Sequence, residues 1–199
     1  MNATEMVVLL DDSGRPIGET PKEAVHTQKT PLHLAFSCYL LNDLGELLLT
    51  RRSPEKQTWP GVWTNSFCGH PAPGEDPKDA VLRRAHYELG VDVGRLELVL
   101  RSFRYRAVDP SGIVENELCP VYTARALGPL RPNPLEVADY AWMSPGLLAE
   151  ALERTPAVFS PWLALQFPRL VEAQALKLGP QAFTDTTAAR TNTEWRRFI

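Results

Sequence analysis

Short hydrophobic runs separated by turn residues dominate the first two thirds of the chain. They are rich in the β-branched, aromatic and other apolar residues that favour strands. The shorter runs are MVVLL (6–10), HLAFSCYLL (33–41), ELLLTRR (46–52) and GVWTNSF (61–67). Two longer runs, LELVLRSFRYRA (96–107) and IVENELCPVYTARA (113–126), each predict one long strand. The pattern predicts a sheet that contains several hairpins.

The VDPSG segment between the two long runs predicts a tight hairpin. Asp109 to Gly112 are suited to a type I turn in which Gly112 takes the left-handed conformation. A three-residue loop with a glycine bulge then pairs Asp109 with Ile113. In this register we expect Tyr105 to lie opposite Glu117.

Capping residues predict two helices in the first half of the chain. TPKEAVH suggests a short helix with Thr20 as N-cap and Glu23 completing a capping box. EDPKDAVLRRAHYELGV has the stronger pattern, with Asp76 as N-cap, Pro77 in the first position and Gly90 just past the end.

Two further helices are expected near the C-terminus. SPGLLAEALER is capped by Ser144, and SPWLALQF is capped by Ser160 and expected to end at Pro168. Beyond about Gly179 the periodicity disappears. Interleaved strands and helices predict an α/β (α+β) domain, a mixed β-sheet core flanked by helices, over residues 1–175. Residues 176–199 are expected to form a loose tail.

Composition and charge exclude several classes of partner. The 199 residues are 44% hydrophobic and 23% charged, with a net charge of -3, as in an ordinary globular protein. Without a basic run, neither a nucleic acid nor an anionic membrane is expected, although an internal anion pocket is compatible with this charge. We find no apolar run of membrane-spanning length and no secretory signal.

Cys38, Cys68 and Cys119 are the three cysteines, so they cannot all pair with one another. We therefore expect a reduced, cytoplasmic protein whose thiols are buried in the core or catalytic. Cys68 and His70 stand two residues apart in the corner TNSFCGHPAPGE (64–75). A core thiol beside a surface imidazole is one explanation, and a reactive corner is the other.

The remaining candidates for chemistry are histidines and glutamates. His26 ends the first predicted helix and His33 opens a strand. Glu115 and Glu117 are two apart in a strand, so they share a face and repel each other unless a positive charge lies between them. A divalent metal ion held by imidazoles and carboxylates would supply that charge. Spacing alone leaves open both a metal site and ordinary hydrogen-bonded side chains.

GHPAPGEDPKDAVLRRAHYELGV (69–91) resembles the Nudix box, in which clustered carboxylates hold Mg²⁺ ions at a diphosphate. The matching positions are Gly69, Glu75, Arg83, Glu88, Gly90 and Val91. Two positions depart from the box, because Arg84 and Tyr87 stand where it has glutamates. The resemblance therefore implies a diphosphate site with one metal carboxylate, Glu88, and an added cation, and it weakens the case for hydrolysis.

The wider sequence is similar to one branch of that superfamily, the type 1 isopentenyl-diphosphate isomerases. The similarity covers about residues 6–175. It is carried by TPLHLAFS, LLTRR, WPGVWTNSFCGHP, RRAHYELGV, FRYRAVDPSGIVENELCPVY and FSPW. It implies a Nudix-like fold and the interconversion of isopentenyl and dimethylallyl diphosphate in isoprenoid biosynthesis, by protonation and deprotonation through a tertiary carbocation.

The family resemblance also implies two metal ions. The positions of its three histidines and two glutamates, which hold one divalent ion, fall on His26, His33, His70, Glu115 and Glu117. We expect Mn²⁺ there, with Zn²⁺ and Fe²⁺ also compatible. The second ion, Mg²⁺, bridges the diphosphate to Glu88 and lies near the Cys68 carbonyl.

The implied catalytic pair is Cys68 and Glu117, with Tyr105 beside the glutamate. We expect Glu117, with Tyr105, to donate the proton and Cys68 to accept one. Trp162 is the aromatic residue implied over the carbon skeleton. The expected diphosphate-binding cations are Lys22, Arg52, Lys56 and Arg84. The expected partner is a small-molecule substrate bound by a monomer.

Two other functions remain to be weighed against this one. A Nudix hydrolase of a diphosphate-linked metabolite is the main alternative, and Arg84 and Tyr87 count against it because they replace metal ligands. A degenerate Nudix fold kept as a binding module is the second alternative. That module would have a broken set of metal ligands and catalytic residues, whereas here the set is complete.

Overall fold

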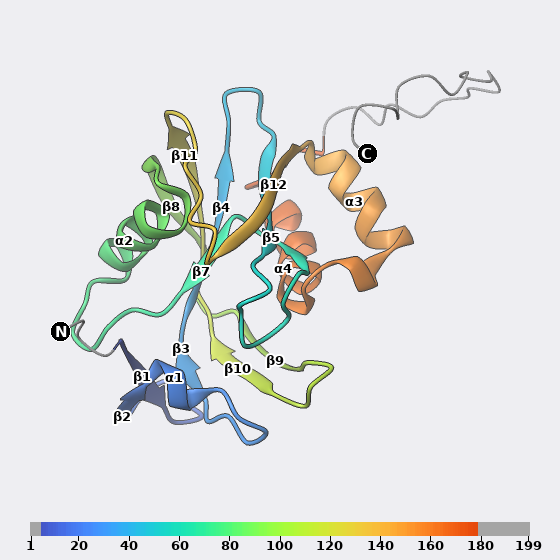
Figure 1. The fold of residues 1–199 in the computed structure, drawn as a ribbon. Helices are drawn as coiled ribbons and strands as arrows, with labels where there is room; N and C mark the ends of the chain where they lie inside the picture. Colours follow the sequence, from blue (N-terminus) through green and yellow to red (C-terminus); the bar gives the residue numbers. More distant parts are fainter. Residues whose placement is uncertain (1–4, 179–199) are drawn as a thin grey trace, which may run out of the picture.

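The computed structural model describes residues 5–178, and its elements are labelled in Figure 1. The helices are α1 (Lys22–Val25), α2 (Pro77–Leu89), α3 (Pro145–Arg154) and α4 (Pro161–Glu172), with a 3-10 turn η1 (Pro156–Val158). The early strands are β1 (Met6–Leu10), β2 (Pro16–Pro21), β3 (His33–Leu34), β4 (Phe36–Leu41), β5 (Leu47–Arg52), β6 (Trp63–Thr64) and β7 (Phe67–Gly69). The later strands are β8 (Asp92–Leu100), β9 (Arg104–Val108), β10 (Val114–Leu118), β11 (Val121–Leu127) and β12 (Val137–Met143). Mixed sheets with flanking helices confirm the predicted α+β class.

The strands form two sheets. One has the strand order β2-β1-β3-β10-β9, and the other has the order β12-β5-β4-β11-β8 with β6 and β7 attached to β5 and β4. Consecutive strands β3 and β4 belong to different sheets, as do β10 and β11. β10 runs parallel to β3 and β11 runs parallel to β4, so these two segments pass side by side from one sheet into the other.

This crossing corrects the prediction of two long strands. The run 96–107 is divided into β8 and β9, and the run 113–126 is divided into β10 and β11. Pro120 lies at the second division and has no N–H to continue a ladder, while its carbonyl accepts a hydrogen bond from the Ser37 amide at 3.0 Å. Each run was long enough for one strand, but its halves pair with different neighbours.

Helices cover both faces of the second sheet. Alternate residues of β4 point to opposite sides, so Phe36, Cys38 and Leu40 pack with α2 in one core cluster and Tyr39 packs with α4 in the other. In Figure 1 α2 stands on one side of this sheet, with α3 and α4 on the other. Burial on both sides explains why these strands read as continuous hydrophobic runs.

The α2 helix confirms its prediction at both ends. The Asp76 side chain accepts a hydrogen bond from the Lys78 amide at 2.8 Å, and Pro77 is the first helical residue. Gly90 takes the left-handed conformation with φ 58°, and an added Cβ there would meet the Arg131 carbonyl oxygen at 2.6 Å. Helices α3 and α4 likewise begin after the predicted caps Ser144 and Ser160.

Three details of the helix and strand prediction are wrong. Thr20 and Pro21 belong to β2, and α1 has no side-chain cap, so the predicted capping box does not form. Helix α4 continues through Pro168 to Glu172, because Leu170 beyond the proline is fully buried in the core. Strand β12 was not predicted; its exposed residues 138–140 weaken the hydrophobic pattern.

The hairpin between β9 and β10 forms as predicted. Asp109 N donates to the Ile113 carbonyl at 2.8 Å, and Gly112 has φ 88°. Tyr105 lies opposite Glu117 in the ladder. This register fixes which side chains of β10 reach the interior.

The predicted domain boundary at residue 175 stays a prediction. Leu176 is buried in the core cluster that contains α4, just past the predicted end of the domain at 175. Most of the predicted tail, 179–199, lies outside the described residues. No helix among residues 5–178 combines the length and apolar character needed to cross a membrane.

Candidate active site

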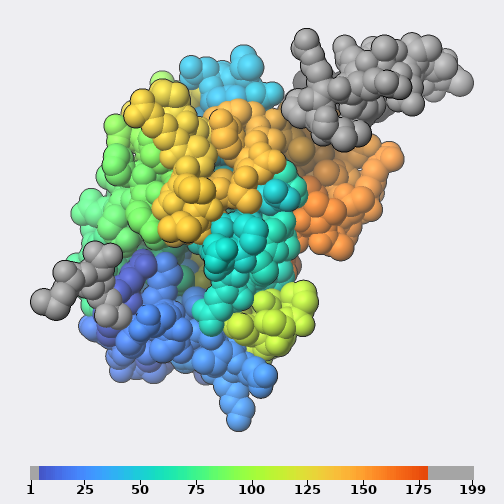
Figure 2. Space-filling model, in the orientation of Figure 1, coloured from blue at the N-terminus to red at the C-terminus, as the bar shows by residue number. Residues whose placement is uncertain are grey.

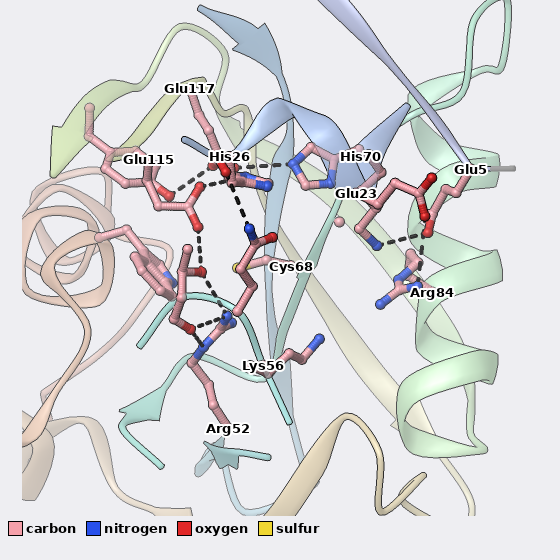
Figure 3. Close-up of a pocket in the computed structure, with 16 residues that line it drawn as sticks. Glu5, Glu23, His26, Arg52, Lys56, Cys68, His70, Arg84, Glu115 and Glu117 are labelled. Atoms are coloured by element: carbon pink, nitrogen blue, oxygen red, sulfur yellow. Dashed lines mark hydrogen bonds and ion pairs between the residues drawn. The ribbon is translucent and has the colours of Figure 1, made fainter. Parts of the chain in front are cut away.

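A pocket of about 540 Å³ lies between the two sheets. Its walls come from β9 and β10 of the first sheet, β5 and β7 of the second, and helices α1, α2 and α4. Figure 2 shows the N-terminal segments, in blue, meeting the teal segment near residue 60 on one face of the molecule. Figure 3 draws the lining side chains. Charged and apolar side chains therefore line the same pocket.

Three imidazoles converge on one carboxylate. His33 pairs with Glu117 across the parallel β3–β10 ladder, and its Nε2 lies 3.5 Å from Glu117 Oε1. His70 Nε2 lies 3.3 Å from the same oxygen. His26 stands against both rings, with centroids 5.2 Å from His33 and 5.7 Å from His70. Elements far apart in the sequence thus bring these four predicted residues together.

Glu115 joins this cluster through His26. Its Oε2 lies 3.0 Å from His26 Nε2, and its Oε1 accepts a hydrogen bond of 2.7 Å from Thr58. Glu115 and Glu117 are both 5% exposed. As the β10 alternation predicted, both carboxylates point into the same space, which Figure 3 shows.

The cluster has the chemistry of a metal site. One ligand atom from each of His26, His33, His70 and Glu117 lies within 4.8 Å of the others. His26 Nε2, His33 Nε2 and Glu115 Oε2 are buried and have no hydrogen-bond partner within residues 5–178. Buried polar atoms are normally paired, so several unpaired atoms facing one point fit a missing cation.

A hydrogen bond to the backbone orients the His33 ring for metal binding. Its Nδ1 lies 3.0 Å from the Pro31 carbonyl oxygen, which can only accept a hydrogen bond. Nδ1 therefore carries the hydrogen, and Nε2 is left with its lone pair facing the cluster. Burial lowers the pKa of His70 to about 4, so that imidazole is neutral near pH 7. Burial alone would also lower the pKa of His33, but Glu117 beside it raises that pKa above its ordinary value.

The histidines beside Glu117 favour its ionised form. Burial alone would raise the pKa of this carboxyl, but the neighbouring His33 and His70 hold the pKa well below the usual range. Tyr105 donates a hydrogen bond of 2.9 Å to Glu117 Oε2. Both carboxylate oxygens therefore act as acceptors.

Cys68 keeps its thiol hydrogen. Burial raises the pKa of this thiol to about 12, and Sγ donates to Asn65 Oδ1 at 3.4 Å. The Ser37 hydroxyl lies 3.3 Å from the same sulfur. We expected Cys68 to accept a proton and Glu117 to give one, and that assignment stays a prediction; the raised pKa of the thiol and the lowered pKa of Glu117 favour the opposite roles.

An aromatic wall stands beside these two groups. The Trp162 ring lies 5.9 Å from Tyr105 and 5.5 Å from Trp59, measured between centroids. The Arg52 guanidinium lies over the same indole at 5.4 Å. Trp162 is 2% exposed, so its lining face is shielded from water.

The four predicted cations all line the pocket, and each has an acidic or carbonyl partner. Lys22 pairs with Glu5 at 2.8 Å, and Lys56 pairs with Glu136. Arg52 donates to the Thr58 carbonyl at 2.7 Å. Figure 3 places Arg52 and Lys56 below the imidazoles and Arg84 to their lower right. The pocket therefore has a cationic part next to the metal-type cluster.

Glu88 lies behind Arg84 in the helix. Arg84 Nη2 donates to Glu88 Oε1 at 2.6 Å, and both side chains are buried. Arg84 Nη2 also lies 3.3 Å from Glu136 Oε1. Arg84 and Glu88 therefore lie on the same face of α2 and form an ion pair with each other in this structure.

Sequence reasoning missed three polar residues of this region: the half-buried Glu5 and Glu136 and the buried Asn65. Glu5 and Glu136 bind the cations, and Asn65 contacts Cys68. None stands in a local pattern that signals its role. Their partners are distant in the sequence, so only the fold reveals these contacts.

Comparison with known proteins agrees with the fold. The NUDIX domain family matches residues 31–163. The crystal structure of DR0079 from Deinococcus radiodurans has a TM-score of 0.64 at 22% identity, covering 83% of this chain and 98% of that one. The MutT protein from Methanosarcina mazei Go1 has a TM-score of 0.58 at 20% identity, covering 72% of this chain and 96% of that one. At these identities the likeness concerns the fold.

Sequence relatives are much closer. The isopentenyl-diphosphate Delta-isomerase of Paenarthrobacter aurescens (strain TC1) is 75% identical over 89% of this chain and 97% of its own. The protein of the same name from Clavibacter michiganensis subsp. michiganensis (strain NCPPB 382) is 55% identical over 94% of each chain. These similarities show that the chain belongs to the NUDIX family and, within it, to the isopentenyl-diphosphate Delta-isomerases.

Proposed function

We propose that this chain is an isomerase that interconverts isopentenyl diphosphate and dimethylallyl diphosphate. One observation carries the proposal: Cys68, Glu117 and Trp162 line the same pocket as four cationic side chains. The first three suit proton transfer to and from an alkene, and the cations suit a diphosphate. The relatives named for this reaction support the same substrate.

The chemistry of the reaction sets what the pocket must provide. Moving the double bond by one carbon adds a proton at one end of an unactivated alkene and removes one nearby. Because no carbonyl group can hold negative charge, the intermediate is a tertiary carbocation. Such a cation needs a proton donor, a base, an electron-rich wall and the exclusion of water.

We assign the donor to Cys68 and the base to Glu117. The raised pKa of Cys68 favours the protonated thiol, and the lowered pKa of Glu117 favours the ionised carboxylate; Glu117 also accepts a hydrogen bond from Tyr105. The Cys68 thiol gives its hydrogen to the terminal alkene carbon, and Glu117 takes a hydrogen from the neighbouring methylene. In the reverse direction the two groups exchange tasks, so each catalyses both directions.

Trp162 is the residue proposed to stabilise the cation. A desolvated aromatic face stabilises a cation by about 2 kcal/mol or more. Tyr105 and Trp59 pack against its ring and keep the wall dry. Lys22, Arg52, Lys56 and Arg84 are proposed to bind the diphosphate and to anchor the hydrocarbon against this wall.

The metal-type cluster is proposed to hold one divalent ion. The proposed ligands are the five residues His26, His33, His70, Glu115 and Glu117, and imidazole with carboxylate suits Mn²⁺ or Zn²⁺. When bound, such an ion would supply positive charge that favours the ionised form of Glu117. It would also hold β10 close to the three histidines. Glu88 and the backbone carbonyl of Cys68 are proposed as the residues that would hold a separate Mg²⁺, which would supply positive charge for the substrate diphosphate.

The cellular setting follows from simpler features. The free cysteines Cys38, Cys68 and Cys119 suit a reducing compartment, so we propose a cytoplasmic enzyme. We also propose that it is a monomer with a single catalytic domain at 1–175. Its partner is the small substrate rather than a nucleic acid or a membrane.

Hydrolysis of a diphosphate is the competing activity, and one assay separates the two. Arg84 and Tyr87 occupy positions where a Nudix hydrolase has metal carboxylates. We expect the protein with Mg²⁺ to convert isopentenyl diphosphate without releasing phosphate, as followed by proton and phosphorus NMR. Phosphate release from this substrate or from nucleoside diphosphate derivatives, without isomerisation, would favour the hydrolase.

A further inference from the structure

Asn65 lies directly behind the pocket wall and is fully buried, with 0% of its surface exposed. It sits between β6 and β7 and is not among the pocket-lining residues of the described chain. A buried amide at this position therefore contacts the substrate only through other side chains. Its hydrogen bonds show which ones.

The orientation of the amide is fixed by two backbone acceptors. Asn65 Nδ2 donates to the Cys38 carbonyl at 3.0 Å and to the Phe67 carbonyl at 2.8 Å. Both N–H groups are used, because a carbonyl oxygen can only accept. The amide oxygen must then face the opposite way, toward Cys68 and Trp162.

That single oxygen receives hydrogen bonds from two groups of the pocket. Trp162 Nε1 donates to Asn65 Oδ1 at 2.9 Å, and Cys68 Sγ donates to it at 3.4 Å. Trp162 belongs to a helix 97 residues further along the chain. The thiol that handles a proton and the indole that faces the cation thus share one acceptor.

We propose that Asn65 is a positioning residue for the isomerisation, which holds the Cys68 thiol and the Trp162 ring at a fixed spacing through its amide oxygen. The proposal rests on the proposed function. The hydrogen bond restricts the rotation of the Cys68 side chain and so fixes the position of its sulfur, and anchoring the indole nitrogen fixes the ring plane. Both groups must face the same carbon skeleton, and misplacement by about 1 Å can cost about 10²-fold in rate.

Thr64 provides a matched control within the same cluster. Its Oγ1 also donates to Asn65 Oδ1, at 2.9 Å, but its other contact is the Ser160 hydroxyl at 2.8 Å. Thr64→Val removes a hydrogen bond to the same oxygen and leaves those of Cys68 and Trp162. Asn65→Leu removes all of them at similar volume.

The experiment measures kcat and KM for isopentenyl diphosphate, per mole of protein shown to be folded by circular dichroism. For Asn65→Leu we expect kcat to fall about 10²-fold with KM within about threefold of wild type, because the cations are untouched. Thr64→Val should stay within about threefold of wild type. Wild-type kcat in Asn65→Leu would overturn the proposal, as would an equal loss in Thr64→Val.

Trp162→Phe supplies the second test, since it keeps an aromatic face and removes the indole N–H. We expect it to lose kcat, and the double variant with Asn65→Leu to lose little more than Asn65→Leu alone. Independent structural damage would instead add. If Asn65→Leu does not fold, the test rests on Trp162→Phe alone. An unchanged kcat in that variant would overturn the proposal. A wild-type protein that does not isomerise the substrate would overturn the proposed function itself, and this proposal with it.

Discussion

Tyr105 and Glu117 lie directly opposite each other on β9 and β10, and the Tyr105 hydroxyl donates a hydrogen bond of 2.9 Å to Glu117 Oε2. The other Glu117 oxygen, Oε1, faces His33 and His70. One carboxylate therefore joins the metal-type cluster to the phenol beside Trp162. This arrangement allows Glu117 to take part in both proton transfer and metal binding.

Tyr105→Phe tests the phenol side of this relationship. Removing the hydroxyl leaves the ring packing and takes one hydrogen bond from the ionised Glu117, so we expect kcat to fall at least about tenfold. The thermal unfolding temperature should change little. Steady-state kinetics and a melting curve measure both effects.

Tyr122→Phe is the control for that variant, because Tyr122 is buried in the core cluster beside α2. It should keep wild-type kcat. If Tyr105→Phe also turns over like wild type, the phenol has no part in proton transfer.

His33→Ala tests the metal-type cluster. Loss of one ligand weakens a metal site strongly, and here it would leave Glu115 and Glu117 to repel each other. We expect the purified variant to contain less than half the wild-type metal per chain, by elemental analysis. His86→Ala removes an exposed imidazole and should not alter the metal content. Equal metal content in both variants would remove His33 from the site.

Glu88→Gln separates the two proposed ions. The amide oxygen can still accept from Arg84, but the charge that would hold Mg²⁺ is lost. We expect KM to rise and raised Mg²⁺ to restore part of the turnover, while the metal on the histidines remains. Glu75→Gln, whose carboxylate binds Arg83 at 2.8 Å away from that pocket, should show no Mg²⁺ dependence. Loss of the histidine-bound metal in Glu88→Gln would contradict two separate ions.

Lys56 gives the pH dependence a definite direction. Burial lowers the pKa of its ammonium to about 8, although the Glu88 charge opposes this shift. Because only the charged form attracts a diphosphate, kcat/KM should be constant below pH 8 and fall above it, by up to about tenfold per pH unit.

Lys56→Arg keeps the charge at every accessible pH, since a guanidinium does not lose its proton there. Its profile should stay flat about two pH units further than that of wild type. An identical decline in both proteins would assign the ionisation to another group.

The helices and the ligand residues could be predicted because their signals are local. Asp76 and Gly90 define α2 through neighbours in the same segment. His26, His33, His70 and Glu117 were recognisable by residue type and by the family motif, and the structure brings them within 4.8 Å. Alternation along β10 was enough to place both glutamates on one face.

Other features depend on contacts between distant segments. Each of the two long runs is divided, the second of them at Pro120, because its halves join different sheets. The hydrophobic pattern of a strand is the same in either sheet, so it does not reveal the division. The roles of Glu5 and Asn65 come from partners in other segments. The hydrogen on Cys68 and the charge on Glu117 depend on burial and on three imidazoles, which the order of residues does not reveal.

The most direct test of the isomerase is conversion of isopentenyl diphosphate in deuterated water with Mg²⁺, followed by mass spectrometry and NMR of the product. The account predicts dimethylallyl diphosphate that carries deuterium in a methyl group, with no phosphate released. Cys68→Ser should lower this rate by about 10²-fold or more, and Cys38→Ser, at a buried thiol on the α2 side of the sheet, should not abolish it. Unlabelled product, phosphate release, or a Cys68→Ser variant that keeps more than about a tenth of the wild-type rate would contradict proton transfer by Cys68 in this pocket.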